Sequence, residues 1–205
     1  MGSVITMGSF EQDGESLNGK EAMEWLVLAQ EGDRALLVSR YALTTRVFGG
    51  STWEQSSLRS WLNEDFLKWS FTDEEKQRIL ETELSADRNP NFATDPGKAT
   101  RDRVFLLSLA EYEKYFPGNS GACEATKDCA RYAYCSKEGS GRLCYWMLRT
   151  PGCDSDSITL VSPAGEPFGG YIKQEGDSVY YSWQMLISAQ NGSLAVRPAM
   201  WISLG

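Results

Sequence analysis

The chain of 205 residues contains no histidine. This absence excludes Ser-His-Asp and Cys-His catalysis, histidine general bases and histidine metal ligands. The cysteines are Cys123, Cys129, Cys135, Cys144 and Cys153, and no two of them form a C-x-x-C pair, so zinc-ribbon spacing is missing as well. We therefore expect small, mostly buried thiols in a reducing compartment.

Basic runs, long apolar runs and nucleotide-binding loops are also absent. The net charge is -8, and no local Lys/Arg cluster offsets it, so nucleic acids and anionic membranes are poor partners. No segment approaches the roughly 20 apolar residues of a membrane span, and the first residues do not form a signal peptide, so we expect no membrane insertion. The localisation stays open between the cytoplasm and, for an excised unit of a longer protein, a cell surface or phage.

Apolar residues, in contrast, are plentiful. They make up 41% of the chain, which is enough to bury a sizeable core, and we expect residues 1–205 to form a single α+β domain. The opening "VITMGSFEQDG" has a strand pattern. Two apolar runs then flank residues 30–33, "QEGD", and predict a β-hairpin.

The most secure helix follows Thr52, where Thr52 and Gln55 match a capping box. Its apolar residues recur at helical spacing and form one stripe. The stripe consists of Leu58, Trp61, Leu62, Phe66 and Trp69. We expect these side chains to lie in the core.

Two further capping boxes predict short helices after Thr72, with Glu75, and after Ser108, with Glu111. Between them, "RVFLLS" at residues 103–108 is a strand candidate, and residues 123–134 are a weaker helix candidate. The last third shows short strands and turns without helical period. The expected strands are "CYWMLRT", "SITLVSP", "PFGGYIK", "SVYYSWQMLIS" and "SLAVRPAMWIS".

Carboxylates are the only chemically versatile groups present in number. Either residues 11–15, with Glu11, Asp13 and Glu15, or the loop at Asp154 and Asp156 offers an acid/base pair, and solvated turn carboxylates are the competing interpretation. Asp154, Ser155 and Asp156 also offer oxygen ligands that suit calcium, although their spacing matches no EF-hand loop. We expect no obligatory cofactor, with calcium as the metal to test.

Two segments near the C-terminus resemble a known family. "CYWMLRTPG" at residues 144–152 and "VRPAMWISL" at residues 196–204 resemble the paired "WWLRSPG" and "VRPALWI" signatures of a bacterial family, domain of unknown function 6273. "ITMGSF", "TWEQSSLRSWLNEDFLKWSF" and "DRVFLLSLAEYEKYF" look like its other segments in the same order, so the resemblance covers nearly the whole chain. The chain departs from it in a longer insertion between the signatures and in its clustered cysteines.

The "WxLR…VRPA" ending is also similar to the C-type lectin-like fold of formylglycine-generating enzymes and of retroelement-diversified variable proteins. This resemblance implies a small twisted antiparallel sheet with two to three helices and long C-terminal loops, in which the N- and C-terminal strands pair. It also implies scaffold roles for Trp146, Arg149, Arg197 and Trp201, the arginines tying loop carbonyls or carboxylates. Trp61, Phe66, Trp146 and Trp201 should then share one core.

The same resemblance implies a display surface in the C-terminal loops, because tyrosine and tryptophan give large contact areas at little entropic cost. The candidate ligand-binding residues are Asp154, Ser155, Asp156, Tyr171, Tyr180, Tyr181 and Trp183. They lead us to expect a non-catalytic module that recognises a protein or a glycan, with core-facing strand residues as the competing interpretation.

Two alternatives remain open. One is a formylglycine-generating-type oxidase that would use Cys144 and Cys153 as its cysteine pair. The other is a structural interaction domain of a larger surface or phage protein, which gene context would distinguish from a diversified binder.

Overall fold

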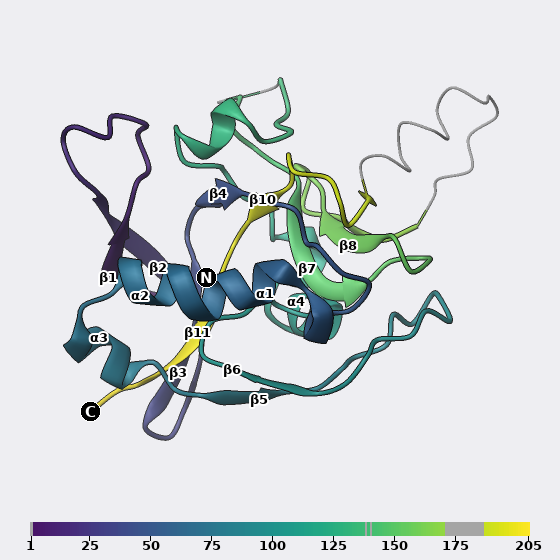
Figure 1. Ribbon diagram of the computed structural model, residues 1–205, viewed down its shortest axis with the longest axis horizontal. Helices are drawn as coiled ribbons and strands as arrows, with labels where there is room; N and C mark the ends of the chain where they lie inside the picture. Colours follow the sequence, from purple (N-terminus) through teal and green to yellow (C-terminus); the bar gives the residue numbers. More distant parts are fainter. Residues whose placement is uncertain (1, 138, 140, 171–186) are drawn as a thin grey trace.

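The computed structural model describes residues 2–137, 139, 141–170 and 187–205, and Figure 1 shows how their elements are arranged. These residues form a mixed α+β fold with curled antiparallel sheets and few helices, as the sequence predicted at this level. Within the described residues, no helix is both long enough and apolar enough to cross a membrane.

The first sheet has the order β1-β2-β3-β11. Its strands are β1 (Val4–Phe10), β2 (Glu21–Glu31), β3 (Arg34–Ser39) and β11 (Ala199–Ser203). The predicted hairpin is confirmed: Glu31 pairs with Arg34, and Gly32 adopts a φ of 61°, a conformation that favours glycine. The predicted pairing of the N- and C-terminal strands is wrong, because the β2–β3 hairpin lies between β1 and β11 and pairs with both.

The second sheet has the order β4-β10-β7-β8-β9. Its strands are β4 (Thr44–Thr45), β10 (Ala195–Val196), β7 (Trp146–Pro151), β8 (Ile158–Val161) and β9 (Pro167–Phe168). All six residues of β7 are buried, including Arg149 and Thr150, whose polar side chains bond to residues 106 and 109. A separate ribbon pairs β5 (Thr82–Leu84) with β6 (Thr100–Asp102). The expected strand "SVYYSWQMLIS" lies mostly outside the described residues.

The predicted long helix is present but is built in pieces. The pieces are the 3-10 turn η1 (Trp53–Gln55), α1 (Ser57–Trp61), the π-helical segment η2 (Leu62–Phe66) and α2 (Leu67–Ser70). The capping box at Thr52 and Gln55 is wrong: the Thr52 side chain caps nothing, and Ser56 caps α1 by accepting a hydrogen bond from the Arg59 amide.

The prediction that Trp69 lies in the core is also wrong, since its side chain is 64% exposed. The π-helical segment hydrogen-bonds with i→i+5 spacing, which rotates the residues after it around the helix axis. The face buried by Leu58, Leu62 and Phe66 therefore continues through Leu67 rather than Trp69.

Both remaining capping boxes are confirmed. They begin α3 (Asp73–Arg78) and α4 (Leu109–Tyr115). The segment 103–108 is not a strand, because the amides of Arg103 and Val104 donate to the Asn63 side chain and only Phe105 forms a bridge. The segment 123–134 contains only the 3-10 turn η4 (Cys129–Arg131), because residues 123–125 bond to residues 142–144 instead.

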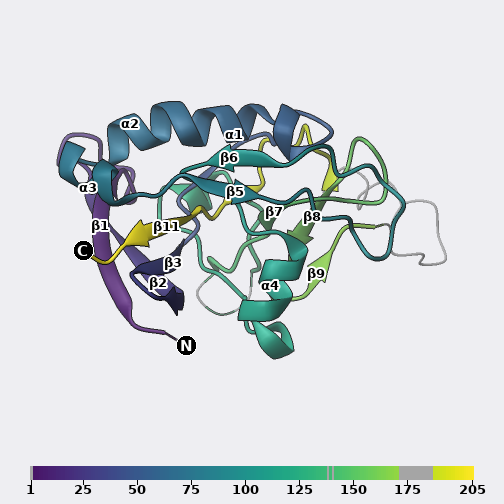
Figure 2. The same cartoon turned by 90° about the horizontal axis from the view of Figure 1, so that it is seen from below.

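The buried apolar side chains form one cluster between the helices and the sheets. Figure 2 shows α1 and α2 on one side of the sheets and α4 on the other. Phe66, Trp146 and Trp201 are buried in this cluster, and Trp61 packs against it half-buried beneath the Arg46 guanidinium. The four aromatic residues expected in one core are thus found there.

Arg149 and Arg197 have the predicted scaffold roles. Arg149 donates to the Leu106 carbonyl at 2.8 Å and forms an ion pair with Glu111. Arg197 donates to the carbonyls of Ser39 and Gly121 at 3.0 and 3.4 Å. These bonds fasten loops to the ends of β7 and β11.

Candidate functional site

The sequence placed the ligand-binding residues in the C-terminal loops, and the structure describes only part of them. Tyr171, Tyr180, Tyr181 and Trp183 lie outside the described residues. Asp154, Ser155 and Asp156 form a turn after β7.

Several polar groups of the turn after β7 form hydrogen bonds within the turn. The Asp154 carboxylate accepts a hydrogen bond from the Asp156 amide at 3.0 Å, and the Asp154 amide donates to the Ser157 hydroxyl at 2.9 Å. This bonding holds the shape of the turn. The residues of this turn belong to no three-residue group of metal-ligand type among the described residues.

A concave surface of the described chain lies around Tyr41, in the connection between β3 and β4. Two hollows, of about 280 and 540 Å³, adjoin there and share Tyr41 in their walls. We call this surface the Tyr41 groove. The smaller hollow is lined by residues that include Gln12, Asp13, Glu21, Glu24, Lys127 and Arg142. The larger hollow is lined by residues that include Leu26, Arg40, Phe116, Cys123, Glu124 and Arg197.

Two ion pairs join the hollows. Glu24 lines the smaller hollow and bonds to Arg40 of the larger one at 3.0 Å. Arg142 lines the smaller hollow and bonds to Glu124 of the larger one at 2.7 Å. All four side chains are between about one third and one half exposed. Such pairs contribute little to stability, so they are available to rearrange around a ligand.

Tyr41 contacts one of these pairs through Arg40. The Ser39 hydroxyl donates to its carbonyl at 2.8 Å, and the Arg40 guanidinium lies 5.3 Å from the centre of its ring. The half-buried ring thus combines an apolar face with a polar hydroxyl, a combination enriched at recognition sites. The sequence analysis missed Tyr41. The available signal was "RY", a charged and aromatic pair directly after the apolar run of β3.

An acidic cluster lies beside the smaller hollow. Glu11, Asp13 and Glu21 each offer a carboxylate oxygen within 4.8 Å of the others, the only such group among the described residues. Oxygen ligands of this kind suit calcium. Each carboxylate already accepts a backbone hydrogen bond of 2.7–2.8 Å within the β1–β2 connection. The hydrogen bonds from the Asn18 side chain and the Glu15 amide also lower the pKa of Asp13. The cluster therefore has a structural role without any ion.

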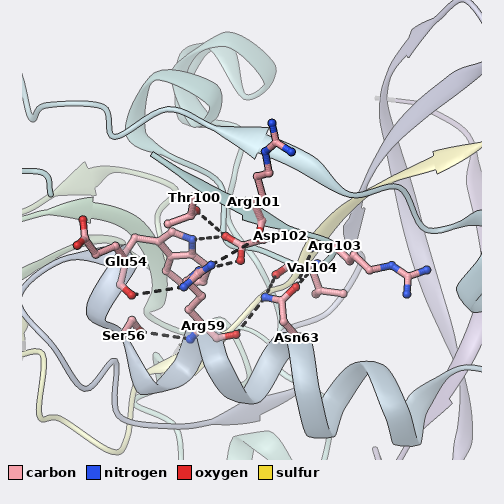
Figure 3. A network of polar contacts seen from close by, with 10 residues as sticks. Glu54, Ser56, Arg59, Asn63, Thr100, Arg101, Asp102, Arg103 and Val104 are labelled. Atoms are coloured by element: carbon pink, nitrogen blue, oxygen red, sulfur yellow. Dashed lines mark hydrogen bonds and ion pairs between the residues drawn. The ribbon is translucent and has the colours of Figure 1, made fainter. Parts of the chain in front are cut away.

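A second polar cluster is internal. Figure 3 shows Asp102 of β6 among donors from the helical segments and from β6 itself. Its carboxylate accepts from Trp53 Nε1 at 2.9 Å, Arg59 Nε at 2.7 Å and the Thr100 hydroxyl at 2.6 Å. The Asn63 side-chain amide also donates a hydrogen bond to the Val104 carbonyl at 2.9 Å. This network ties α1 to β6 and leaves the Asp102 carboxylate no access to solvent, so it belongs to the scaffold.

The structure does not bring the candidate oxidase cysteines together. Cys144 precedes β7 and Cys153 follows it, and a six-residue strand spans roughly 20 Å. A disulfide needs Cα atoms closer than about 7 Å. Cys144 instead lies next to Cys123 and Cys135, a proximity that the sequence spacing did not reveal.

The fold and the groove define a class: a mixed α+β protein with a surface groove of mixed charge. Residues 27–204 match the family described as Domain of unknown function (DUF6273), so the chain belongs to this family, as its two signatures predicted. No curated protein and no solved structure matches the chain.

Proposed function

We propose that the chain is a non-catalytic binding module that holds a segment of a protein ligand in the Tyr41 groove. One observation carries this proposal: two adjoining hollows share Tyr41 and are joined by ion pairs that are partly exposed. Hot spots of protein interfaces are enriched in tyrosine and arginine, and they lie at the centre of the buried patch.

The charges of the groove favour a polypeptide over a glycan. Glu24 and Arg40 on one side, and Arg142 and Glu124 on the other, present both signs of charge along one surface. A peptide carrying both acidic and basic side chains complements this pattern, and electrostatic complementarity gives specificity. A neutral glycan would leave these charges unused.

The C-terminal loops remain a second proposed surface. The tyrosines and the tryptophan of residues 171–186 supply suitable ligand contacts by composition. We also propose a C-type lectin-like variant as the finer fold, supported by the α+β architecture and by the buried "WMLR" and "VRPA" segments. Diversification by a retroelement would apply to the loops and not to the groove.

A structural interaction domain within a larger surface or phage protein is the remaining alternative. The exposed ion pairs of the groove favour reversible recognition over a permanent interface, because permanent interfaces are more hydrophobic. Gene context with surface-anchor domains would support the structural alternative.

The direct test is a binding screen of the purified chain against peptide and glycan arrays, with and without calcium. The variants are Tyr41→Ala for the groove and the double variant Tyr180→Ala/Trp183→Ala for the loops. Trp69→Ala is the matched control, because Trp69 is an exposed aromatic residue that lines neither hollow.

The groove proposal expects peptide binding that Tyr41→Ala weakens at least about tenfold and that Trp69→Ala leaves unchanged. Binding that is lost only in the double variant would show that the ligand contacts the C-terminal loops and not the groove. Glycan binding that persists in Tyr41→Ala would contradict the groove proposal, as would the absence of any binding.

A further inference from the structure

Three cysteines form a row across neighbouring extended segments. Glu124 and Leu143 form an antiparallel bridge, which places Cys123 opposite Cys144. A second antiparallel bridge joins Cys144 to Cys135 on its other side. Side chains of opposite residues in antiparallel pairs project to the same face, with Cα atoms about 4.5–5.5 Å apart. Cys144 therefore has one thiol neighbour on each side.

Cys123 is the closer neighbour of Cys144. The Cys144 thiol donates to the Cys123 carbonyl at 3.5 Å, and the Cys144 amide donates to the same carbonyl at 3.0 Å. Opposite positions in antiparallel pairs have the Cα separation that a disulfide needs. Among the described residues, no three cysteine sulfurs lie close enough together to hold a metal ion. This arrangement fits a dithiol and not a zinc site.

Arg197 places an unusual charge beside this pair. Its side chain is buried, lies 4.8 Å from the Trp146 ring centre and donates to the Ser39 and Gly121 carbonyls, and it forms no ion pair with a carboxylate of the described residues. A buried charge without a counter-ion is costly, and cation–π contacts offset only part of that cost. Arg197 and Cys123 line the same hollow, so a Cys123 thiolate would serve as the counter-ion.

The two thiols differ in pKa because Arg197 lines the same hollow as Cys123. Burial opposes ionisation of Cys123, but the adjacent Cys144 side chain and the positive charge of Arg197 outweigh it and lower the pKa of Cys123 to about 7. The pKa of Cys144 is raised, first by the adjacent Cys123 side chain and then by burial. Near neutral pH, Cys123 is thus the nucleophile and Cys144 keeps its proton.

We propose that Cys123 and Cys144 form an oxidation site, in which a small hydroperoxide that enters the larger hollow of the Tyr41 groove converts the two thiols to a disulfide. The Cys123 thiolate attacks one peroxide oxygen, the O–O bond breaks, and hydroxide or alkoxide leaves, so Cys123 becomes a sulfenic acid. The Cys144 sulfur then attacks the Cys123 sulfur. The S–S bond forms, and the hydroxyl group leaves as water with the Cys144 proton. The hydroperoxide gains two electrons and the cysteine pair loses two.

The test is treatment of the folded chain with hydrogen peroxide, followed by intact mass and peptide mapping without reduction. The expected product has lost two hydrogen atoms, contains a Cys123–Cys144 link, and returns to the starting mass with dithiothreitol. Cys144→Ser should stop at a Cys123 sulfenic acid that dimedone labels, and Cys123→Ser should form no such link. Cys135→Ser is the matched control and should leave the Cys123–Cys144 link intact.

The pH dependence gives an independent readout. The rate of Cys123 alkylation by iodoacetamide should rise with a midpoint near pH 7. Arg197→Met should shift the midpoint upwards, while Arg197→Lys, which keeps the charge, should shift it less. Circular dichroism establishes that each variant is folded. A link between Cys144 and Cys135, or thiols that react only after unfolding, would overturn the proposal. This test does not depend on what the Tyr41 groove binds.

Discussion

The network around Asp102 and the Tyr41 groove both contain arginine–carboxylate ion pairs, but in opposite surroundings. In the network, Arg59 approaches Asp102 to 2.7 Å, and the carboxylate is 1% exposed. In the groove, the Glu24 and Glu124 side chains are 39% and 32% exposed, although their arginines approach to 3.0 and 2.7 Å. Distance alone therefore does not distinguish a buried ion pair from a partly exposed one.

The degree of burial determines how much free energy is lost when an ion pair is broken. Breaking a buried pair leaves an uncompensated charge inside the protein, whereas breaking an exposed pair returns two charges to water. The Asp102 carboxylate also has two further internal donors, Trp53 and Thr100. We conclude that the charges of the network stabilise the fold, whereas the charges of the groove are partly solvated.

The largest expected effect is therefore that of Asp102→Ala. Removal of this carboxylate leaves Arg59 and the Trp53 indole N–H without their acceptor. It should lower the free energy of unfolding by about 3–5 kcal/mol. Urea denaturation measures this change. Asp102→Asn retains an acceptor for Trp53 and should lose less. A loss below about 1 kcal/mol in Asp102→Ala would show that the network is not a structural centre.

Tyr41 should show the reverse pattern. Tyr41→Ala should change the free energy of unfolding by about 1 kcal/mol or less, but reduce ligand affinity at least about tenfold, which corresponds to about 1.4 kcal/mol. Tyr41→Phe keeps the ring and should retain most of the affinity. Calorimetric titration with the peptide from the array screen measures both variants. Equal losses of stability and affinity would place Tyr41 in the scaffold.

The features that could be predicted from the sequence are those that depend on residues close together in the chain. The capping boxes at Thr72 and Ser108 were predictable, because each depends on residues three positions apart. The strand β7 was predictable because it is an apolar run bounded by a turn. These signals are local. The "WMLR" and "VRPA" segments allowed the family to be predicted, since their residues are distinctive.

The failures arise where distant residues decide the local structure. The strand at residues 103–108 is replaced by hydrogen bonds to Asn63, about 40 residues earlier. The exposure of Trp69 depends on a π-helical segment that the apolar period does not reveal. The Tyr41 groove combines residues from β2, the β3–β4 connection and residues 122–142, so no single segment carries its signal.

A smaller effect is expected from the ion pairs of the groove. Glu24→Gln should alter the free energy of unfolding by less than about 1 kcal/mol, because its bond to Arg40 is exposed. Ligand binding should weaken and become less sensitive to salt, since one complementary charge is lost. Glu31→Gln is the matched control, as Glu31 forms an equally exposed pair with Arg34 and lines neither hollow. An equal effect of both variants on binding would contradict the assignment of the groove.

The smallest effect concerns Asp13, which lies on the wall of the smaller hollow. Its pKa is lowered from the ordinary value of 3.8 by the Asn18 side chain and the Glu15 amide. Ionised Asp13 thus stabilises the β1–β2 connection above the unfolded-state pKa, and this contribution is lost as the pH falls through the lower folded-state pKa. Hydrogen exchange of the Glu15 amide should therefore become as fast in the wild type as in Asp13→Asn only below about pH 4. If the difference between the two proteins instead grows on acidification, the protonated form of Asp13 is the one that stabilises the connection, which would contradict the lowered pKa.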